Sequence, residues 1–159
     1  MVLGLETPGA AVAAYERMIG AVAKAAPDAR IDGVILQHMV PEGLEIVIGA
    51  RIDPAFGPLV LVGLGGVLVE LMADSVTAPA PVSQSQALDM LSKLRAAPLL
   101  DGFRNMPPVD RDALARIIVR VSEFATDHAD KIAELDINPV ICHGSNTVAA
   151  DALIVLKRT

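Results

Sequence analysis

The chain has 159 residues, of which 53% are hydrophobic and only 3% aromatic, and its formal net charge is −6 at pH 7. The high hydrophobic content excludes a disordered chain, and the acidic, aromatic-poor composition argues against a nucleic-acid binder, which needs cationic and stacking side chains. The single cysteine, Cys142, excludes an internal disulfide and a cysteine-cluster zinc site.

The longest apolar run, residues 54–69, is shorter than the roughly 20 residues that a membrane-spanning helix needs, and prolines and glycines interrupt it. The chain does not open with the charged and apolar pattern of a signal peptide. We therefore expect a soluble, cytoplasmic protein. The length fits a single domain, since domains usually have about 100–200 residues.

The first predicted element is a helix that begins after Thr7 and ends before Pro27. Thr7 is a typical N-cap, and Pro8 fits the first helical position. Two runs rich in β-branched residues follow, 33–40 and 44–52, joined by a short turn. They predict two consecutive strands.

The middle of the chain predicts a loop over 53–58 and a strand over 59–62. A turn made by Gly63, Gly65 and Gly66 follows, and residues 67–71 return to an apolar run.

A proline-rich stretch, residues 75–83, is unsuited to a helix. Ser83 and Gln86 have the spacing of a capping box, which predicts a helix from there to about Leu94. Residues 96–108 predict a long loop.

Asp110 is expected to cap the next helix, which carries an apolar stripe. The stripe consists of Leu114, Ile117, Val121 and Phe124. Two strands, 134–142 and 147–156, follow around a turn at 143–146. Paired strands with separate helices predict an α+β fold with a mainly antiparallel sheet and flanking helices.

A group of oxygen-bearing side chains marks the last hairpin. Glu134, Asp136 and Asn138 alternate, so in a strand they share one face. The turn can bring Asp151 close to Asn138. Carboxylate and amide oxygens suit Mg²⁺, so the spacing indicates a metal site; the alternative is a set of solvated polar residues on an edge hairpin.

Two further patterns allow a ligand-binding or a structural interpretation. The glycines after residue 62 can present backbone N–H groups to a phosphate, or simply form a tight turn between buried strands. Glu45, a lone acid in an apolar strand, indicates either a ligand contact or an outward-facing position. We interpret His38, His128, His143 and Cys142 as structural residues.

Taken together, five ordered segments resemble the ATP-grasp domain of NDP-forming acyl-CoA synthetases, which include ADP-forming acetyl-CoA synthetases and succinyl-CoA synthetases. The segments are 33–39, 45–49, 51–58, 63–70 and 134–139. The most specific blocks are DPxFGP, GLGGVLVE and ELDINP, and the resemblance covers nearly the whole chain. It implies an ATP-grasp-like C-terminal lobe.

The resemblance also implies a set of site residues. Asn138 and Asp151 match the ligands of Mg²⁺, with Asp136 close by, and Arg51 is a loose candidate for the transferred phosphoryl group. The implied nucleotide contacts are Gln37, His38 and Met39 at the adenine, Glu45 at the ribose, and Gly65 and Gly66 at the phosphates. Some relatives continue their metal ligand as Asp-Ala-Arg, whereas Leu153 stands here in place of the arginine.

The implied reaction converts acyl-CoA, ADP and phosphate into carboxylate, CoA and ATP through a phosphohistidine. We expect the chain to be one lobe of a longer polypeptide, to need CoA-binding and ligase domains or a subunit as partners, and to be inactive and self-associating when isolated. The alternative function is a nucleotide-sensing or interaction module of a fused protein acetyltransferase.

Overall fold

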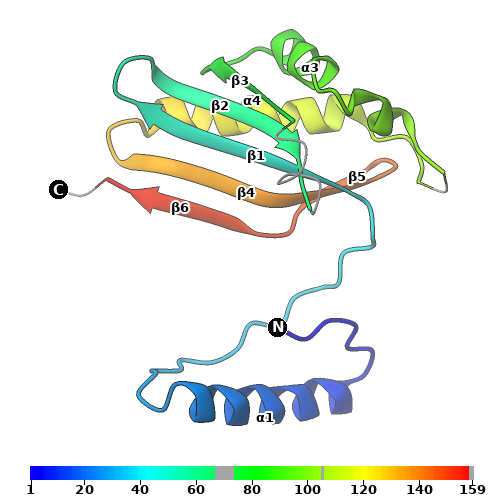
Figure 1. Cartoon of the computed structure of the whole chain (residues 1–159), viewed down its shortest axis with the longest axis vertical. Helices are drawn as coiled ribbons and strands as arrows, with labels where there is room; N and C mark the ends of the chain where they lie inside the picture. The colour runs from blue at the N-terminus through cyan, green and yellow to red at the C-terminus, as the bar shows by residue number, and fades with distance from the viewer. Residues whose placement is uncertain (67–73, 105, 158–159) are drawn as a thin grey trace. The chain divides into compact units, whose positions relative to one another are not determined.

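The computed structural model describes residues 1–66, 74–104 and 106–157 (Figure 1). These residues form two compact units, Met1–Met39 and Val40–Thr159. Across the described part of the chain, no helix is both long enough and apolar enough to span a membrane.

The first unit contains one helix, α1 (Pro8–Ala25). The Thr7 side chain accepts a hydrogen bond from the Ala10 backbone N–H at 3.2 Å, and Pro8 opens the helix. The helix ends at Ala25, ahead of Pro27, because proline cannot continue it. The sequence prediction for this element is confirmed.

The strand predicted over 33–40 is wrong, because these residues have no regular secondary structure in the structure. A strand is stable only when its backbone N–H and C=O groups pair with a neighbouring strand. No strand forms in the described residues of the first unit that could supply this pairing. β-propensity alone therefore did not produce a strand here.

The second unit is built on a six-stranded antiparallel sheet in the order β3-β2-β1-β4-β5, with β6 also paired to β4 (Figure 1). The strands are β1 (Leu44–Asp53), β2 (Gly57–Leu64), β3 (Ser75–Pro79), β4 (Ile132–His143), β5 (Asn146–Ala149) and β6 (Ala152–Leu156). The predicted α+β class with a mainly antiparallel sheet and flanking helices is confirmed.

In the described part of the second unit, the helical segments are α3 (Gln84–Ser92), the 3-10 helix η1 (Ala97–Asp101) and α4 (Arg111–Asp127). Ser83 and Gln86 form the predicted capping box, and Asp110 accepts a hydrogen bond from the Ala113 N–H at 2.9 Å. Both helix starts were therefore predicted from local side-chain chemistry.

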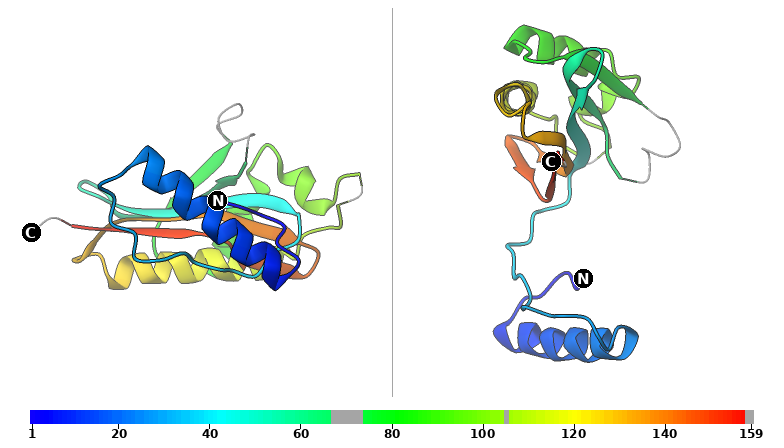
Figure 2. Two further views of the ribbon diagram at one scale, coloured as in Figure 1. Left: turned by 90° about the horizontal axis from the view of Figure 1, so that it is seen from below. Right: turned by 90° about the vertical axis from the view of Figure 1, so that its left-hand side faces the viewer.

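Helix α4 packs against one face of the sheet, and α3 packs against α4 and β3 (Figure 2). The strand β1 alternates between buried and half-buried residues up to Ala50, so Leu44, Ile46, Ile48 and Ala50 enter the core while the residues between them face away. We call the side of the sheet opposite α4, which carries Glu45, Gly49 and Arg51, the far face.

Several strand boundaries differ from the prediction. The strand β3 forms inside the proline-rich stretch, because its proline stands at the end of an edge strand, where a missing N–H is tolerated. The predicted last strand is broken into β5 and β6 around Asp151. The apolar run 67–71 lies outside the described residues.

Candidate functional site

Two of the predicted metal ligands, Asn138 in β4 and Asp151 between β5 and β6, are backbone neighbours. The Asn138 backbone N–H donates to the Asp151 carbonyl at 3.2 Å. The pairing between β1 and β4 shifts between Ile46 and Ile48, which places a bulge in β4 at Asn138. Bulges re-aim side chains, and Asn138 and Asp151 are both exposed at this point.

Asp136 lies in β4 two residues before Asn138, and it pairs with Gly49 on the far face. Burial raises the pKa of the Asp136 carboxyl, and the negative charges of Glu134 and Asp151 raise it further. Oxygen ligands with uncompensated negative charge suit a hard divalent cation. The structure thus assembles the predicted set of Asn138, Asp151 and Asp136.

The donor set has two carboxylates and one amide. In the described part of the chain, no group of three or more His, Cys, Asp and Glu side chains is arranged to hold a metal ion. The Asp151 carboxylate accepts a hydrogen bond from the Ala152 N–H at 2.8 Å. These residues would therefore hold Mg²⁺ together with ligands from outside this set, such as waters and phosphates.

The glycine turn, at Gly65 and Gly66, is in close contact with Glu45. The Gly65 N–H donates to the Glu45 carbonyl at 2.7 Å, and a Cβ on Gly65 would lie 2.9 Å from Glu45 backbone and side-chain carbons. Gly66 has φ +67°, and a Cβ there would lie 2.8 Å from Glu45 Oε2. Only glycine fits these two positions without strain. The structure therefore brings together three residues that were predicted for one nucleotide site.

Arg51 lies on the far face, opposite Glu134 in the β1–β4 pairing. Its guanidinium donates to Asp53 Oδ2 at 3.3 Å. Hydrogen bonds from the Ala55 and Phe56 N–H groups, together with the charge of Arg51, hold the pKa of Asp53 below its usual value. The hairpin tip between β1 and β2 is therefore ordered around a carboxylate.

A groove of about 380 Å³ crosses the far face and connects Arg51 with Asp136. Its other lining residues are Gly49, Ala50, Leu59, Val60, Leu61, Thr77, Glu134 and Leu135. One cation and two carboxylates thus share an otherwise apolar groove, an arrangement that suits a ligand carrying both charged and apolar parts.

The adenine contacts predicted at Gln37, His38 and Met39 belong to the other unit, where all three residues are exposed and irregular. Their role stays a prediction. The remaining residues of the GLGGVLVE block, from Val67 onward, lie outside the described residues.

Three of the residues interpreted as structural, Cys142, His128 and His143, are buried or make contacts within the chain. Burial raises the pKa of the Cys142 thiol to about 11, which keeps it protonated and unreactive. His128 Nδ1 lies 3.0 Å from the Phe124 carbonyl at the end of α4, and His143 Nδ1 lies 2.7 Å from the Glu42 carbonyl.

Asp74 is a buried carboxylate that the sequence interpretation missed. It accepts hydrogen bonds from the Arg95 and Ala96 N–H groups at 2.9 and 2.8 Å, and its carbonyl accepts from Leu64. Asp74 therefore ties the end of β2 to the end of α3. No local sequence signal marks this role, because the partners of its carboxylate lie more than twenty residues away.

Residues 1–156 match the ATP-grasp domain family. The β subunit of the ADP-forming acetate–CoA ligase I of Pyrococcus furiosus is 42% identical over 130 residues, covering 82% of this chain and 56% of that subunit. The β subunit of ligase II of the same organism is 34% identical over 159 residues, covering 99% of this chain and 67% of that subunit. The chain thus spans between about half and two thirds of these relatives.

A solved structure shows the same likeness in three dimensions. It is the dinucleotide-forming acetyl-coenzyme A synthetase 1 of Ca. Korarchaeum cryptofilum in complex with coenzyme A, Ca-AMPCP and HgCl+. The TM-score is 0.92 at 38% sequence identity, and the match covers 98% of this chain and 68% of that one.

Proposed function

The chain belongs to the ATP-grasp domain family, in the branch of the ADP-forming acyl-CoA synthetases, and on that premise we propose that it binds ATP or ADP with Mg²⁺ as part of such a ligase. The complete enzyme would interconvert acyl-CoA, ADP and phosphate with carboxylate, CoA and ATP. A further structure of the Korarchaeum enzyme contains coenzyme A, Mg-AMPPCP and a phosphohistidine segment that points towards its nucleotide site.

The observation that supports the proposal is that two residue groups lie along the same strand, β1, on the far face. Glu45 contacts Gly65 and Gly66 near one end of β1, while Gly49, further along the same strand, pairs with Asp136. A glycine turn suited to phosphate and oxygen ligands suited to a cation are thus both attached to one strand.

Each group has a defined task in this proposal. Asn138 and Asp151, with Asp136 nearby, would hold Mg²⁺, which neutralises charge on the phosphates during phosphoryl transfer. Glu45 would accept hydrogen bonds from the ribose, and Gln37, His38 and Met39 would contact the adenine. Arg51 would approach the phosphoryl group from the groove that it lines.

Binding partners and location belong to the same proposal. We propose that CoA-binding and ligase domains, either in a separate subunit or in the same polypeptide, complete the enzyme. The naming of the two Pyrococcus relatives as β subunits supports this. A cytoplasmic location is proposed because nucleotide and CoA are substrates of that compartment.

The test is a calorimetric titration of Mg-ATP and Mg-ADP into the complete enzyme and into its Asp151→Asn variant. Loss of one carboxylate should weaken Mg²⁺-dependent nucleotide binding by at least about tenfold, or about 1.4 kcal/mol. Asp127→Asn, at the end of α4, removes the same charge outside the predicted metal set and should leave binding unchanged.

Two outcomes would contradict the proposal. If the complete enzyme binds no nucleotide, the assignment of the site fails. If binding persists in Asp151→Asn with an unchanged dependence on Mg²⁺ concentration, Asp151 is not a metal ligand.

A further inference from the structure

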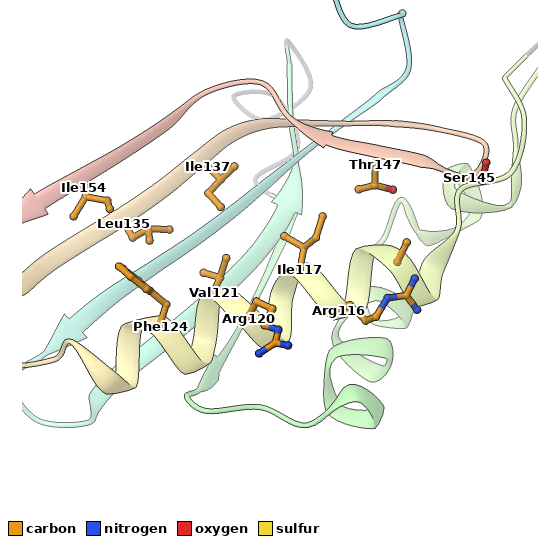
Figure 3. Close-up of a pocket in the computed structure, with 11 residues that line it drawn as sticks. Arg116, Ile117, Arg120, Val121, Phe124, Leu135, Ile137, Ser145, Thr147 and Ile154 are labelled. Carbon is orange, nitrogen blue, oxygen red and sulfur yellow. The ribbon is translucent and has the colours of Figure 1, made fainter.

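A second groove lies on the opposite side of the sheet from the far-face site, between α4 and the β4–β6 edge (Figure 3). Its volume is about 590 Å³. The floor is apolar and is formed by Ile117, Val121, Phe124, Leu135, Ile137 and Ile154. We call this surface, with the residues at its rim, the α4 groove.

The rim of the α4 groove is positively charged. Among the residues that the structure describes, Arg116 and Arg120 are the only charged ones lining it, and they lie one helical turn apart on α4 (Figure 3). This stands out because acidic residues outnumber Lys and Arg by 19 to 13 in the chain. Arg120 contacts Glu123 at 3.3 Å, but both side chains are largely exposed, so that pair contributes little.

The dimensions favour a protein segment over a small molecule. The lining residues of α4 run from Ala113 to Phe124, which at 1.5 Å per residue corresponds to about 16 Å, or three helical turns. Small-molecule sites enclose most of their ligand, whereas Ile154 in this wall remains 46% exposed. The apolar surface continues into Leu156, which is 67% exposed.

We propose that the α4 groove docks an amphipathic helix of a partner polypeptide that carries two acidic residues one turn apart. Helices bind such grooves through apolar side chains at i, i+3 or i+4, and i+7. Carboxylates on the flank of that helix would pair with Arg116 and Arg120, since Arg–carboxylate pairs form two parallel hydrogen bonds. The proposal is independent of the nucleotide site, because that site uses the other face of the sheet.

The test uses the full chain and a fluorescein-labelled designed peptide of about 18 residues. The peptide has leucines along one face and two glutamates four positions apart; a sister peptide has lysines in their place. Fluorescence anisotropy should give at least about tenfold tighter binding of the acidic peptide. The double variant Arg116→Glu, Arg120→Glu should reverse this preference.

The matched control is Arg17→Glu with Arg30→Glu, which makes the same change in net charge at residues that do not line the α4 groove. It should keep the wild-type preference. Circular dichroism verifies that each variant is folded. Equal binding of the two peptides, or binding of neither, would overturn the proposal.

A dimer detected by sedimentation and lost in the Arg116→Glu, Arg120→Glu variant would also overturn it. That result would mean that a second copy of the chain occupies the groove. Because the peptide assay needs no nucleotide, a failure of this proposal is distinguishable from a failure of the nucleotide assignment.

Discussion

Burial raises the pKa of the Asp136 carboxyl, and the nearby negative charges of Glu134 and Asp151 raise it further. A raised pKa means that ionised Asp136 is less favourable in the folded chain than in the unfolded one. This cost is present above the raised pKa and absent well below it. A bound divalent cation would remove it.

We therefore predict that Asp136→Asn stabilises the metal-free chain at pH 7 by up to about 1 kcal/mol, the scale of a like-charge pair on a sheet. The gain should shrink as the pH falls through the raised pKa and should vanish below the usual aspartate value of about 4. Urea unfolding at several pH values measures this. An equal effect at pH 7 and pH 3 would show that packing, not charge, is responsible.

Gly65 and Gly66 lie where a side chain would collide with Glu45. We predict that Gly65→Ala and Gly66→Ala each lower the free energy of unfolding by about 1–3 kcal/mol, because a Cβ needs either a backbone shift or a strained φ. Gly49→Ala is the control, since its Cβ would lie 3.5 Å from the nearest atom. Denaturant titration compares the three; equal losses would remove the steric explanation.

At the scale of elements, the helix starts were predictable because their signals are local. Thr7, Ser83 and Asp110 each cap a helix with a side chain only three residues from its bonding partner. The antiparallel hairpins around 53–57 and 143–146 were likewise marked by turn residues.

The elements that the sequence did not predict depend on distant partners. Residues 33–40 have strand-like composition but form no strand, while β3 has a proline at its end and forms one by pairing with β2. The candidate site shows the same division. The neighbouring residues Gly65 and Gly66 were predictable from a motif, whereas their close contact with Glu45 depends on the sheet.

Helix α4 is attached to the segment before α3 through one buried hydroxyl. Ser122 accepts a hydrogen bond from the Val82 N–H at 3.0 Å and donates to the Val119 carbonyl. Ser122→Ala would leave the N–H of buried Val82 unpaired, and should cost about 1–3 kcal/mol.

The control for that prediction is Ser92→Ala, whose hydroxyl bonds locally to Asp89 on an exposed part of α3. Its effect on the free energy of unfolding should stay within about 0.5 kcal/mol. Thermal unfolding followed by circular dichroism distinguishes the two variants. Similar melting temperatures would show that the hydrogen bond between Val82 and Ser122 adds no net stability.

At the scale of the whole molecule, a row of exposed apolar residues lies on β6, at one edge of the sheet. Leu153, Ile154, Val155 and Leu156 of β6 are between 40% and 67% exposed, and within the described residues β6 pairs only with β4. Apolar edge strands readily pair with another chain. This supports the proposal that the isolated chain self-associates.

We predict that Val155→Lys shifts the isolated chain towards the monomer, since a charge on an edge strand opposes pairing. Ser92→Lys adds the same charge on the surface of α3 and should leave the association unchanged. Sedimentation velocity over a concentration series measures both. A wild-type chain that stays monomeric throughout would refute the proposal of self-association.

The strand β4 contributes side chains to both grooves, one on each side of the sheet. In β4, Ile137 lines the α4 groove and Leu135 lines both grooves, while Asp136 between them lines the groove on the far face, where we propose the nucleotide site. Because side chains alternate with a period of two, one inserted or deleted residue would exchange the two surfaces at once. Substitutions in β4 can therefore change one surface and leave the other as it is. A change in the length of this strand would disrupt both surfaces.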